Sequence, residues 1–495
     1  MPGRAGEVMM VRARAALVAV ASFAVGAAFV AAAPATAASR PVPSGRSTAA
    51  ATTVVRGADS IRATTLANGM KVIVWSDRDI PNVALYNWVR VGSRNETLGK
   101  TGLAHFFEHM MFNGTARRAP GEFDRLMEAQ GGANNAFTSD DVTVYSDWFP
   151  RSALELIFDL EADRLQNLAF DPKVVESERG VVFSERRFSY EDNNANFLSE
   201  QVQSTAFVAH PYQIPTIGWP SDIRGWKLED LQAFFRTHYA PNNCTLVVVG
   251  DVSADEVFAL ARRWLEPIPR QPAPPAVRTR EPEQLGEKRV RVERRAQTPL
   301  LQVAYKAPAA GDARGPALNL LMSVLGQGDS SRLHRELVET QKLAIEVSAY
   351  WNESLDPGLA WFDMVLPAGG DPAVLERAFD AQLARVVAEG ITDAELRRAK
   401  NLEAAAFWAG IATIDGKARR LGEFEVMQGD WQMLFAAPPA YEAVTREQVQ
   451  AIARELLQAR HRTVGVLVPQ QPATSDAATD DGGEGGDAGR GTSAP

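Results

Sequence analysis

His105-Phe106-Phe107-Glu108-His109 is the most informative stretch of this chain. On an α-helix, residues four apart lie on one face, so the imidazoles of His105 and His109 can bind the same metal ion. Glu108 lies three residues after His105 and next to His109, which lets its carboxylate reach a water on that metal without taking a ligand position. The pattern predicts a helix with two metal ligands and a general base. The alternative is a helix that carries two histidines by chance.

A catalytic zinc site of this kind needs a third protein ligand, because the fourth position is kept for water. The chain has a single cysteine, and no histidine lies between His109 and His210, so the candidates are acidic. Glu178 and Glu185 are two turns apart on one face of a helix predicted over residues 172–188. One can bind the metal while the other hydrogen-bonds a ligand histidine or the water, and the spacing does not tell which. A solvated acidic helix face is the alternative.

These motifs make the chain resemble a known family. The order H-x-x-E-H inverts the commoner H-E-x-x-H pattern and is typical of the inverzincin metallopeptidases. Glu178-Arg-Gly-Val-Val-Phe-Ser-Glu185 matches the E-R-x-V-V-x-x-E segment of the pitrilysin/insulinase family of zinc peptidases, which includes the mitochondrial processing peptidases. Gly131-Gly-Ala-Asn-Asn-Ala-Phe-Thr138 and Tyr239-Ala-Pro-Asn-Asn243 also resemble that family. The likeness covers about residues 60–470 and is stronger in the first half of the chain.

The resemblance implies a zinc peptidase with one Zn2+ site. It gives His105, His109 and Glu185 as the metal ligands, Glu108 as the general base, and Glu178 as a supporting acid. A zinc ion would lower the pKa of its water and polarise the scissile carbonyl. Glu108 would take the proton of that water and pass it to the leaving amine.

Residues 134–138 (Asn-Asn-Ala-Phe-Thr) are expected to form a sheet edge that binds an extended peptide as an added strand. A turn into an ordinary strand is the alternative. The resemblance gives three substrate-binding residues in this segment: Asn135, Ala136 and Phe137. Arg332 and Tyr350 in the second half of the chain are candidates for groups that assist catalysis. In the resembled family an inactive half closes over the substrate, so the resemblance implies peptides and unfolded polypeptide segments, rather than compact proteins, as substrates.

At 495 residues the chain is too long for one hydrophobic core and suggests two domains of about 200 residues each. A proline-rich stretch within residues 267–287 is predicted to be a linker. Strand-like and helix-like runs follow in the same coarse order before and after it, but only the first half carries H-x-x-E-H. This order fits a duplicated α+β unit, and the resemblance implies two homologous α/β-roll halves, each an antiparallel sheet plus helices, that form a clamshell. The catalytic half would span residues 59–266 and the inactive half residues 288–470.

The N-terminus has the features of an export signal. Two arginines precede an apolar run from Ala15 to Ala33, and Ala35-Thr-Ala37 fits a cleavage site of small residues. We expect a signal peptide over residues 1–37 and a periplasmic or secreted protein, without stable membrane insertion after the signal is removed. An uncleaved membrane anchor is the alternative. A flexible lead over residues 38–58 and a disordered, acidic, glycine-rich tail over residues 471–495 complete the predicted organisation.

The net charge of −9 gives no indication of nucleic-acid binding. We expect peptide substrates as partners, and the resemblance also allows a homo- or heterodimer with a related peptidase-like subunit. Two alternatives to an independent zinc endopeptidase stay open. One is the zinc-bearing subunit of a heteromeric peptidase, and the other is a non-catalytic homologue that holds substrate or serves a structural role. The complete set of metal-site residues favours the enzyme.

Overall fold

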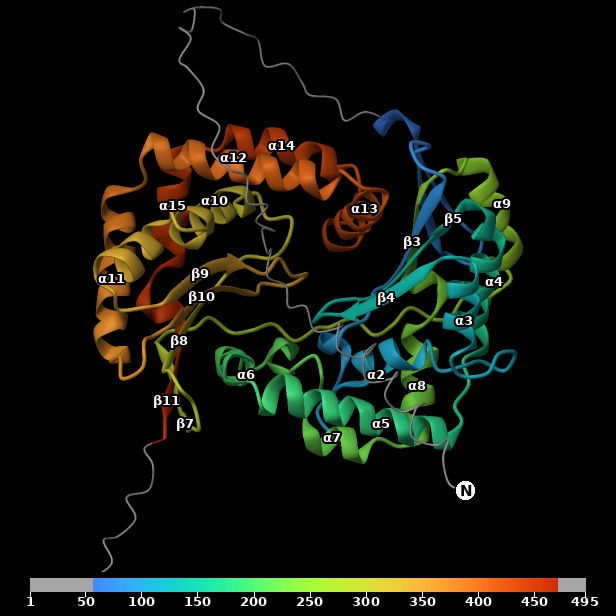
Figure 1. Ribbon diagram of the computed structural model, residues 1–495, viewed down its shortest axis with the longest axis horizontal. Helices are drawn as coiled ribbons and strands as arrows, with labels where there is room; N and C mark the ends of the chain where they lie inside the picture. The colour runs from blue at the N-terminus through green and yellow to red at the C-terminus, as the bar shows by residue number, and fades with distance from the viewer. Residues whose placement is uncertain (1–56, 471–495) are drawn as a thin grey trace, which may run out of the picture.

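The computed structural model describes residues 57–470. The predicted signal peptide, nearly all of the predicted lead and the predicted tail lie outside the described residues. The described chain forms two α/β units, the first drawn in blue to green and the second in yellow to red (Figure 1). Among residues 57–470, no helix combines the length and the apolar character needed to cross a membrane.

The first unit is built on a six-stranded sheet in the order β1-β2-β6-β3-β5-β4. Its strands are β1 (Ile61–Thr65), β2 (Lys71–Ser76), β3 (Asn82–Val89), β4 (Ala133–Thr138), β5 (Thr143–Pro150) and β6 (Cys244–Gly250). Neighbouring strands are antiparallel except β2 and β6, which are parallel. The central strands β3 and β6 are almost fully buried because both faces of the sheet are covered, whereas β4 is partly exposed. The segment predicted to be a sheet edge is thus an edge strand.

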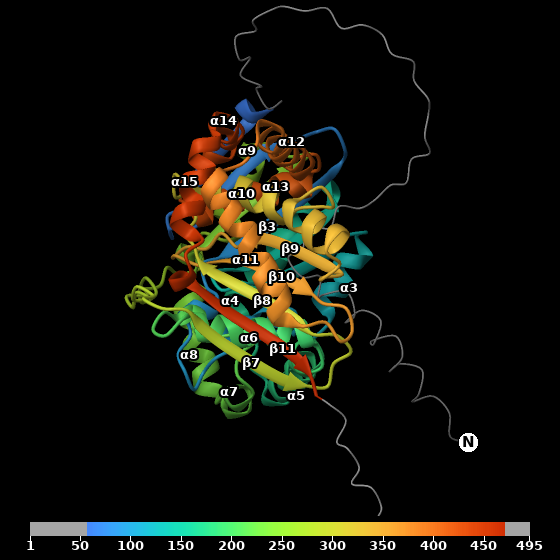
Figure 2. The same cartoon turned by 90° about the vertical axis from the view of Figure 1, so that its left-hand side faces the viewer.

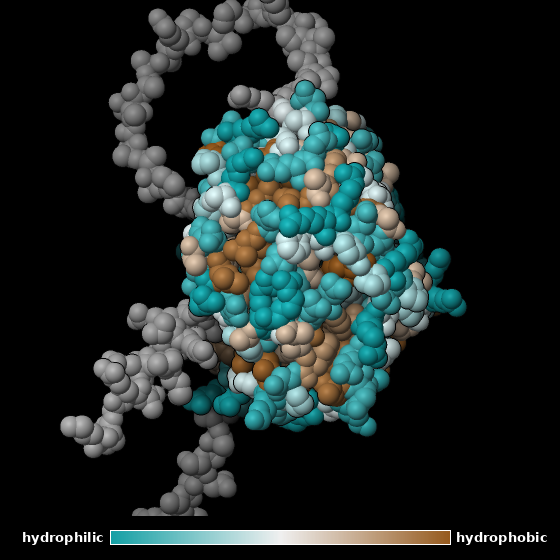
Figure 3. All heavy atoms as spheres, turned by 90° about the vertical axis from the view of Figure 1, so that its right-hand side faces the viewer, coloured by the Kyte–Doolittle hydropathy of each residue, from teal (hydrophilic) through white to brown (hydrophobic). Residues whose placement is uncertain are grey.

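The main core of the first unit lies between one face of this sheet and several helices. The helices of the unit are α2 (Leu103–Met110), α3 (Glu122–Ala129), α4 (Leu154–Asn167), α5 (Pro172–Arg186), α6 (Asn194–Ala206), α7 (Pro220–Gly225), α8 (Leu228–His238) and α9 (Ala254–Trp264). Helix α5 begins where the Asp171 side chain accepts a hydrogen bond from the N–H of Lys173 at 2.7 Å. On the side that carries α4 and α9, hydrophilic residues surround several hydrophobic patches (Figure 3), as is usual for a protein surface.

The second unit repeats this arrangement without a counterpart of β1. Its sheet has the order β7-β11-β8-β10-β9, with β11 between β7 and β8 (Figure 2). Its elements are β7 (Lys288–Arg294), β8 (Leu300–Lys306), α10 (Gly315–Gly326), β9 (Glu346–Trp351), β10 (Leu359–Val365), α11 (Pro372–Glu389), α12 (Asp393–Gly410), α13 (Ile414–Gln428), α14 (Met433–Ala443), α15 (Arg446–Leu456) and β11 (Arg462–Pro469). The pair β7/β11 is parallel, as β2/β6 is, and β9 is an edge strand, as β4 is. The predicted fold of two homologous halves is therefore confirmed.

Each unit covers part of the open face of the other unit's sheet with a helix, and residues of α14 such as Leu434 join α13 on the first sheet. Helix α13 packs on β3 and β6 of the first sheet, and α6 packs on β11 of the second (Figure 1). A glycine allows the close approach at both contacts. A Cβ atom on Gly422 of α13 would lie 2.0 Å from Nε1 of Trp88, and one on Gly465 of β11 would lie 2.2 Å from Cγ2 of Val202. The two halves of the clamshell are therefore interlocked rather than merely adjacent.

Candidate metal centre

Helix α2 and the C-terminal end of helix α5 bring the three predicted metal ligands together. The Nε2 atoms of His105 and His109 lie 3.6 and 3.3 Å from Oε2 of Glu185. One ligand atom from each residue lies within 4.8 Å of the other two, and no second group of this kind is found among residues 57–470. Two imidazoles and one carboxylate are a donor set that zinc takes in catalytic sites. The residues present therefore fit a zinc ion.

Glu178 contacts His109 on the side of the ring away from the other two ligands. Its Oε1 lies 2.7 Å from Nδ1 of His109, whereas Nε2 of the same ring faces Glu185. Donation from Nδ1–H to Glu178 fixes the ring and leaves the lone pair of Nε2 free for a metal. The two glutamates that spacing alone could not distinguish thus take different places. Glu185 lies next to both imidazoles, and Glu178 lies behind one of them.

The carboxylates around the two imidazoles give the site an excess of negative charge, which the pKa values reflect. Burial opposes ionisation of Glu185, but hydrogen bonds with His105 and His109 hold its pKa well below the usual range. Burial likewise opposes protonation of His109, but hydrogen bonds with Glu178 and Glu185 raise its pKa to about 10. These groups together stabilise positive charge between the two helices. A divalent cation is a second way to supply that charge.

Glu108 lies beside the ligand cluster and is not one of its members. Its carboxylate is half-buried, and its Oε2 accepts a hydrogen bond from Oγ1 of Thr138 at 2.6 Å. Thr138 is the last residue of β4, so this hydrogen bond ties the predicted base to the edge strand. The carboxylate is therefore oriented by the same strand that is predicted to bind substrate.

Helix α2 begins after a glycine and is held by a buried carboxylate. Gly102 has φ of 87°, and a Cβ atom there would lie 2.6 Å from the carbonyl oxygen of Ile217. The carboxylate of Glu96 accepts hydrogen bonds from the N–H groups of Gly102 at 2.6 Å and Ala104 at 2.7 Å, and so caps the helix. Burial raises the pKa of Glu96 to about 8 in spite of these hydrogen bonds. No spacing in the sequence points to Glu96 or Thr138, because both reach the site only through the fold.

The side chains of β4 alternate between its two faces. Ala136 packs into the main core of the first unit, on the side of α2. Phe137 lies on the opposite side with its ring centroid 6.1 Å from that of Trp88, in the cluster that α13 covers. Asn135 is exposed, and its Oδ1 accepts a hydrogen bond from the N–H of Ala136 at 2.9 Å. Helix α2 contacts β4 directly, and substrate binding by this strand stays a prediction.

Arg332 and Tyr350 make their contacts away from helix α2. The guanidinium of Arg332 donates hydrogen bonds to the carboxylate of Glu395 at 2.5 and 2.7 Å and to the carbonyl oxygen of Gly390 at 3.0 Å. Tyr350 belongs to the hydrophobic cluster between α6 and the second sheet. Burial, and then the charge of Asp363, raise the pKa of its phenol. A catalytic contribution from either residue stays a prediction.

Sequence comparisons relate the chain to known proteins. The family model for Insulinase (Peptidase family M16) matches residues 71–219, and the model for the Peptidase M16 inactive domain matches residues 225–403. The zinc protease PqqE of Helicobacter pylori is 33% identical over 352 residues, which are 70% of this chain and 78% of that protein. The uncharacterized zinc protease ML0855 of Mycobacterium leprae is 31% identical over 397 residues, which are 79% and 88% of the two chains. A probable mitochondrial-processing peptidase subunit beta of Arabidopsis thaliana is 28% identical over 349 residues, or 68% and 64%.

Solved structures share the two-unit fold. A protease from Helicobacter pylori superimposes with a TM-score of 0.80 at 29% identity, over 83% of this chain and 99% of that chain. The periplasmic protease PqqL of Escherichia coli has a TM-score of 0.70 at 19% identity, over 84% of this chain but only 48% of that chain. The family models, the relatives in sequence and this fold agree with the resemblance stated above. The chain belongs to the insulinase family of peptidases, peptidase family M16.

Proposed function

We propose that this chain is a zinc metalloendopeptidase that hydrolyses peptides and unfolded polypeptide segments. The observation that carries the proposal is the proximity of Nε2 of His105 and Nε2 of His109 to Oε2 of Glu185, with one ligand atom from each residue within 4.8 Å of the other two. Glu108 lies beside this set and is free to act as a base. The names of its relatives, zinc proteases from Helicobacter pylori and Mycobacterium leprae, support the same metal and the same reaction.

The residues around the metal divide the chemistry among them. His105, His109 and Glu185 would hold a zinc ion, which would supply Lewis-acid chemistry by lowering the pKa of a water and polarising the peptide carbonyl. Glu108 takes a proton from the attacking water and returns it to the leaving amine. Because Thr138 donates a hydrogen bond to Oε2 of Glu108, Oε1 is the oxygen left to carry that proton. Glu178 holds His109 in the tautomer that presents Nε2.

The unpaired edge of β4 is the basis for the proposed class of substrate. One side of β4 pairs with β5, and its other side has no strand partner in the described sheet. An extended peptide can add to that side through main-chain hydrogen bonds, as in other β-augmentation sites. Asn135 and Ala136 lie in the middle of the strand, and their mutual hydrogen bond would exchange for bonds to substrate. A compact folded protein has no free extended strand to offer, so flexible segments are the favoured substrates.

The chain can also act together with a second subunit. It spans 48% of Escherichia coli PqqL, so a chamber built like that protein would need a second chain of similar size. The Arabidopsis relative is named as the beta subunit of a mitochondrial-processing peptidase. These observations favour a homo- or heterodimer with a related peptidase-like subunit as the second candidate. In that case the chain is the zinc-bearing subunit.

We also propose that the protein is exported to the periplasm or secreted. The basis is the apolar run followed by Ala35-Thr-Ala37, which lies outside the described residues. The structural relative PqqL is named as a periplasmic protease. N-terminal sequencing of the native protein from the cell envelope and the medium is expected to begin just after Ala37 or Ala38. An intact Met1 recovered only from the cytoplasm would contradict export.

The central proposal is tested by incubating the purified chain with a flexible peptide of a few tens of residues. We expect one zinc per chain, cleavage that a chelator abolishes, and recovery of cleavage when zinc is restored. The same peptide sequence placed in a rigid strand of a folded domain is expected to stay intact. A chain that binds no zinc contradicts the proposal. A chain that binds zinc but cleaves only after a related subunit is added identifies the heteromeric alternative.

A further inference from the structure

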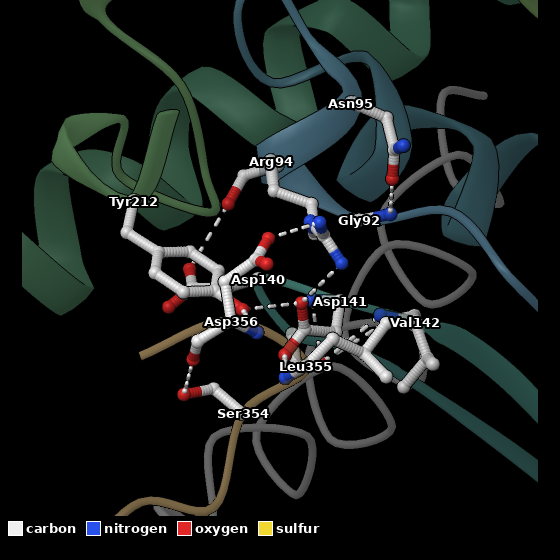
Figure 4. Close-up of polar contacts among 12 residues, drawn as sticks. Gly92, Arg94, Asn95, Asp140, Asp141, Val142, Tyr212, Ser354, Leu355 and Asp356 are labelled. Carbon is white, nitrogen blue, oxygen red and sulfur yellow. Dashed lines mark hydrogen bonds and ion pairs between the residues drawn. The ribbon is translucent and has the colours of Figure 1, made fainter. Parts of the chain in front are cut away.

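A polar cluster joins the two units next to the end of β4 (Figure 4). Arg94 of the first unit pairs with Asp356, which lies in the loop between β9 and β10 of the second unit. Nη1 of Arg94 also lies 3.4 Å from Oδ1 of Asp141, in the turn that follows β4. The side chain of Arg94 is only 12% exposed, so its charge depends on these two carboxylates.

Further hydrogen bonds connect side chains of the first unit to the loop of the second unit that contains Asp356. The hydroxyl of Tyr212 donates to Oδ1 of Asp141 at 2.7 Å and accepts from the backbone N–H of Asp356 at 3.0 Å. The N–H of Leu355 donates to Oδ2 of Asp141 at 3.0 Å. His210 accepts a backbone N–H at Nδ1, so its neutral ring carries hydrogen on Nε2, 3.0 Å from Oδ2 of Asp356. The loop of the second unit is thus bound by side chains of the first at several points.

One series of contacts connects this cluster to helix α2, which carries the two histidines of the candidate metal site. Arg94 lies two residues before Glu96, in the short segment that follows β3. The Glu96 carboxylate accepts the N–H groups of Gly102 and Ala104, and Gly102 has no side chain with which to cap α2 itself. A shift of Arg94 therefore moves the group that fixes the start of α2. His105 lies about one turn, and His109 about two turns, further along that helix.

A second series of contacts connects the cluster to Glu108, the proposed general base. Asp141 lies three residues after Thr138, and the turn between them is closed by a hydrogen bond from the N–H of Ser139 to the carbonyl oxygen of Val142 at 2.8 Å. Thr138 in turn donates to the Glu108 carboxylate. The neighbouring Asp140 accepts a hydrogen bond from Oγ of Ser93, next to Arg94. The segment that contains Arg94 and the turn that contains Asp141 therefore contact each other as well as the loop of the second unit.

We propose that Asp356 is a positioning residue for the catalytic site of the first unit. Through Arg94 it holds the segment that caps α2, and its loop holds the turn that orients Thr138 and Glu108. The role rests on the proposed peptidase function, since it concerns the geometry of that site. A small displacement of a catalytic group is enough to lower a turnover rate substantially, because the reacting atoms must stay aligned. The inactive unit thus contributes to catalysis by fixing the active one.

The test compares full-length, zinc-loaded variants. Asp356→Ala is expected to lower kcat at least ~10-fold while the zinc content stays at one per chain. Asp356→Asn keeps an oxygen that accepts from Arg94 and is expected to restore most of the rate. The matched control is Asp77→Ala, which removes the carboxylate partner of Lys417 at another contact between the units. The control is expected to leave kcat unchanged even if it lowers Tm.

A second readout does not depend on activity. Hydrogen exchange at the start of α2 and in β4 is expected to be faster in Asp356→Ala than in the wild type or in Asp77→Ala. If Asp356→Ala does not fold, Arg94→Lys keeps the charge without the planar fork and is expected to give the same two changes. Unchanged kcat and exchange in Asp356→Ala, or an equal loss of kcat in Asp77→Ala, would overturn the positioning role. A wild-type chain that binds zinc but cleaves nothing refutes the proposed function instead, and the exchange data still test the linkage.

Discussion

Glu108→Gln is expected to lower peptide hydrolysis at least ~100-fold while the protein keeps its zinc, since general-base catalysis contributes on that scale. The amide has the same size as the carboxylate, and its oxygen can still accept the hydrogen bond from Thr138. It cannot take a proton from water at neutral pH. Because Glu108 lies outside the set of three ligands, the metal is not expected to leave. Measurement of kcat together with zinc per chain separates the two effects.

The matched control for this variant is Glu128→Gln, in the nearby helix α3. Glu128 is exposed and belongs to neither the ligand cluster nor the contacts of Thr138, so the substitution is expected to leave both kcat and zinc unchanged. Near-normal turnover in Glu108→Gln would exclude this residue as the base. Loss of zinc in the same variant would show that the carboxylate takes part in binding the metal.

Helix spacing pointed to the two histidines of the candidate site, whereas the third candidate ligand came from the resemblance to the insulinase family, because spacing alone did not distinguish Glu178 from Glu185. His105 and His109 meet on one turn of α2, and Glu185 falls on one face of α5. The segment predicted to be a sheet edge, residues 134–138, lies in the edge strand β4. The proximity of the two histidines follows from helix geometry alone.

The remaining features depend on contacts between distant parts of the chain. Glu96 caps α2 only because the segment after β3 folds against it, and no periodicity marks that contact. The apolar faces of α6 and α13 indicate that both helices are buried. They do not indicate that each helix is buried against the sheet of the other unit. The pairing of Arg94 with Asp356 likewise joins residues from opposite halves of the chain, and no local pattern in the sequence indicates it.

Glu185→Gln is expected to remove most of the bound zinc, which would make it the most damaging single change at the site. A neutral amide is a poor zinc ligand, and the two histidines alone would leave the ion with too few donors. Glu178→Gln is expected to be milder and to cost about 10- to 100-fold in zinc affinity, the usual effect of changing a group that orients a ligand histidine. Zinc affinity of each purified variant, measured by competition with a chelator of known strength, gives the order.

The pH dependence of zinc affinity is a second test of the role assigned to Glu178 as the partner of His109. A histidine must be neutral to bind a metal, and without metal the pKa of His109 is raised to about 10 by Glu178 and Glu185 against the effect of burial. Below that pH a proton must leave when zinc binds, so affinity in the wild type is expected to rise with pH. Glu178→Gln removes part of the cause of the raised pKa and is expected to flatten this rise.

Glu176→Gln is the matched control for both glutamates, because Glu176 lies on the same helix with its side chain 73% exposed and paired with Arg179. Its zinc affinity is expected to equal that of the wild type. If Glu185→Gln keeps full zinc while Glu178→Gln loses it, the two roles are reversed and the metal lies on the other side of His109. That result would require Nδ1 of His109 to be the ligand atom. It would also move the metal away from His105, whose Nε2 faces Glu185.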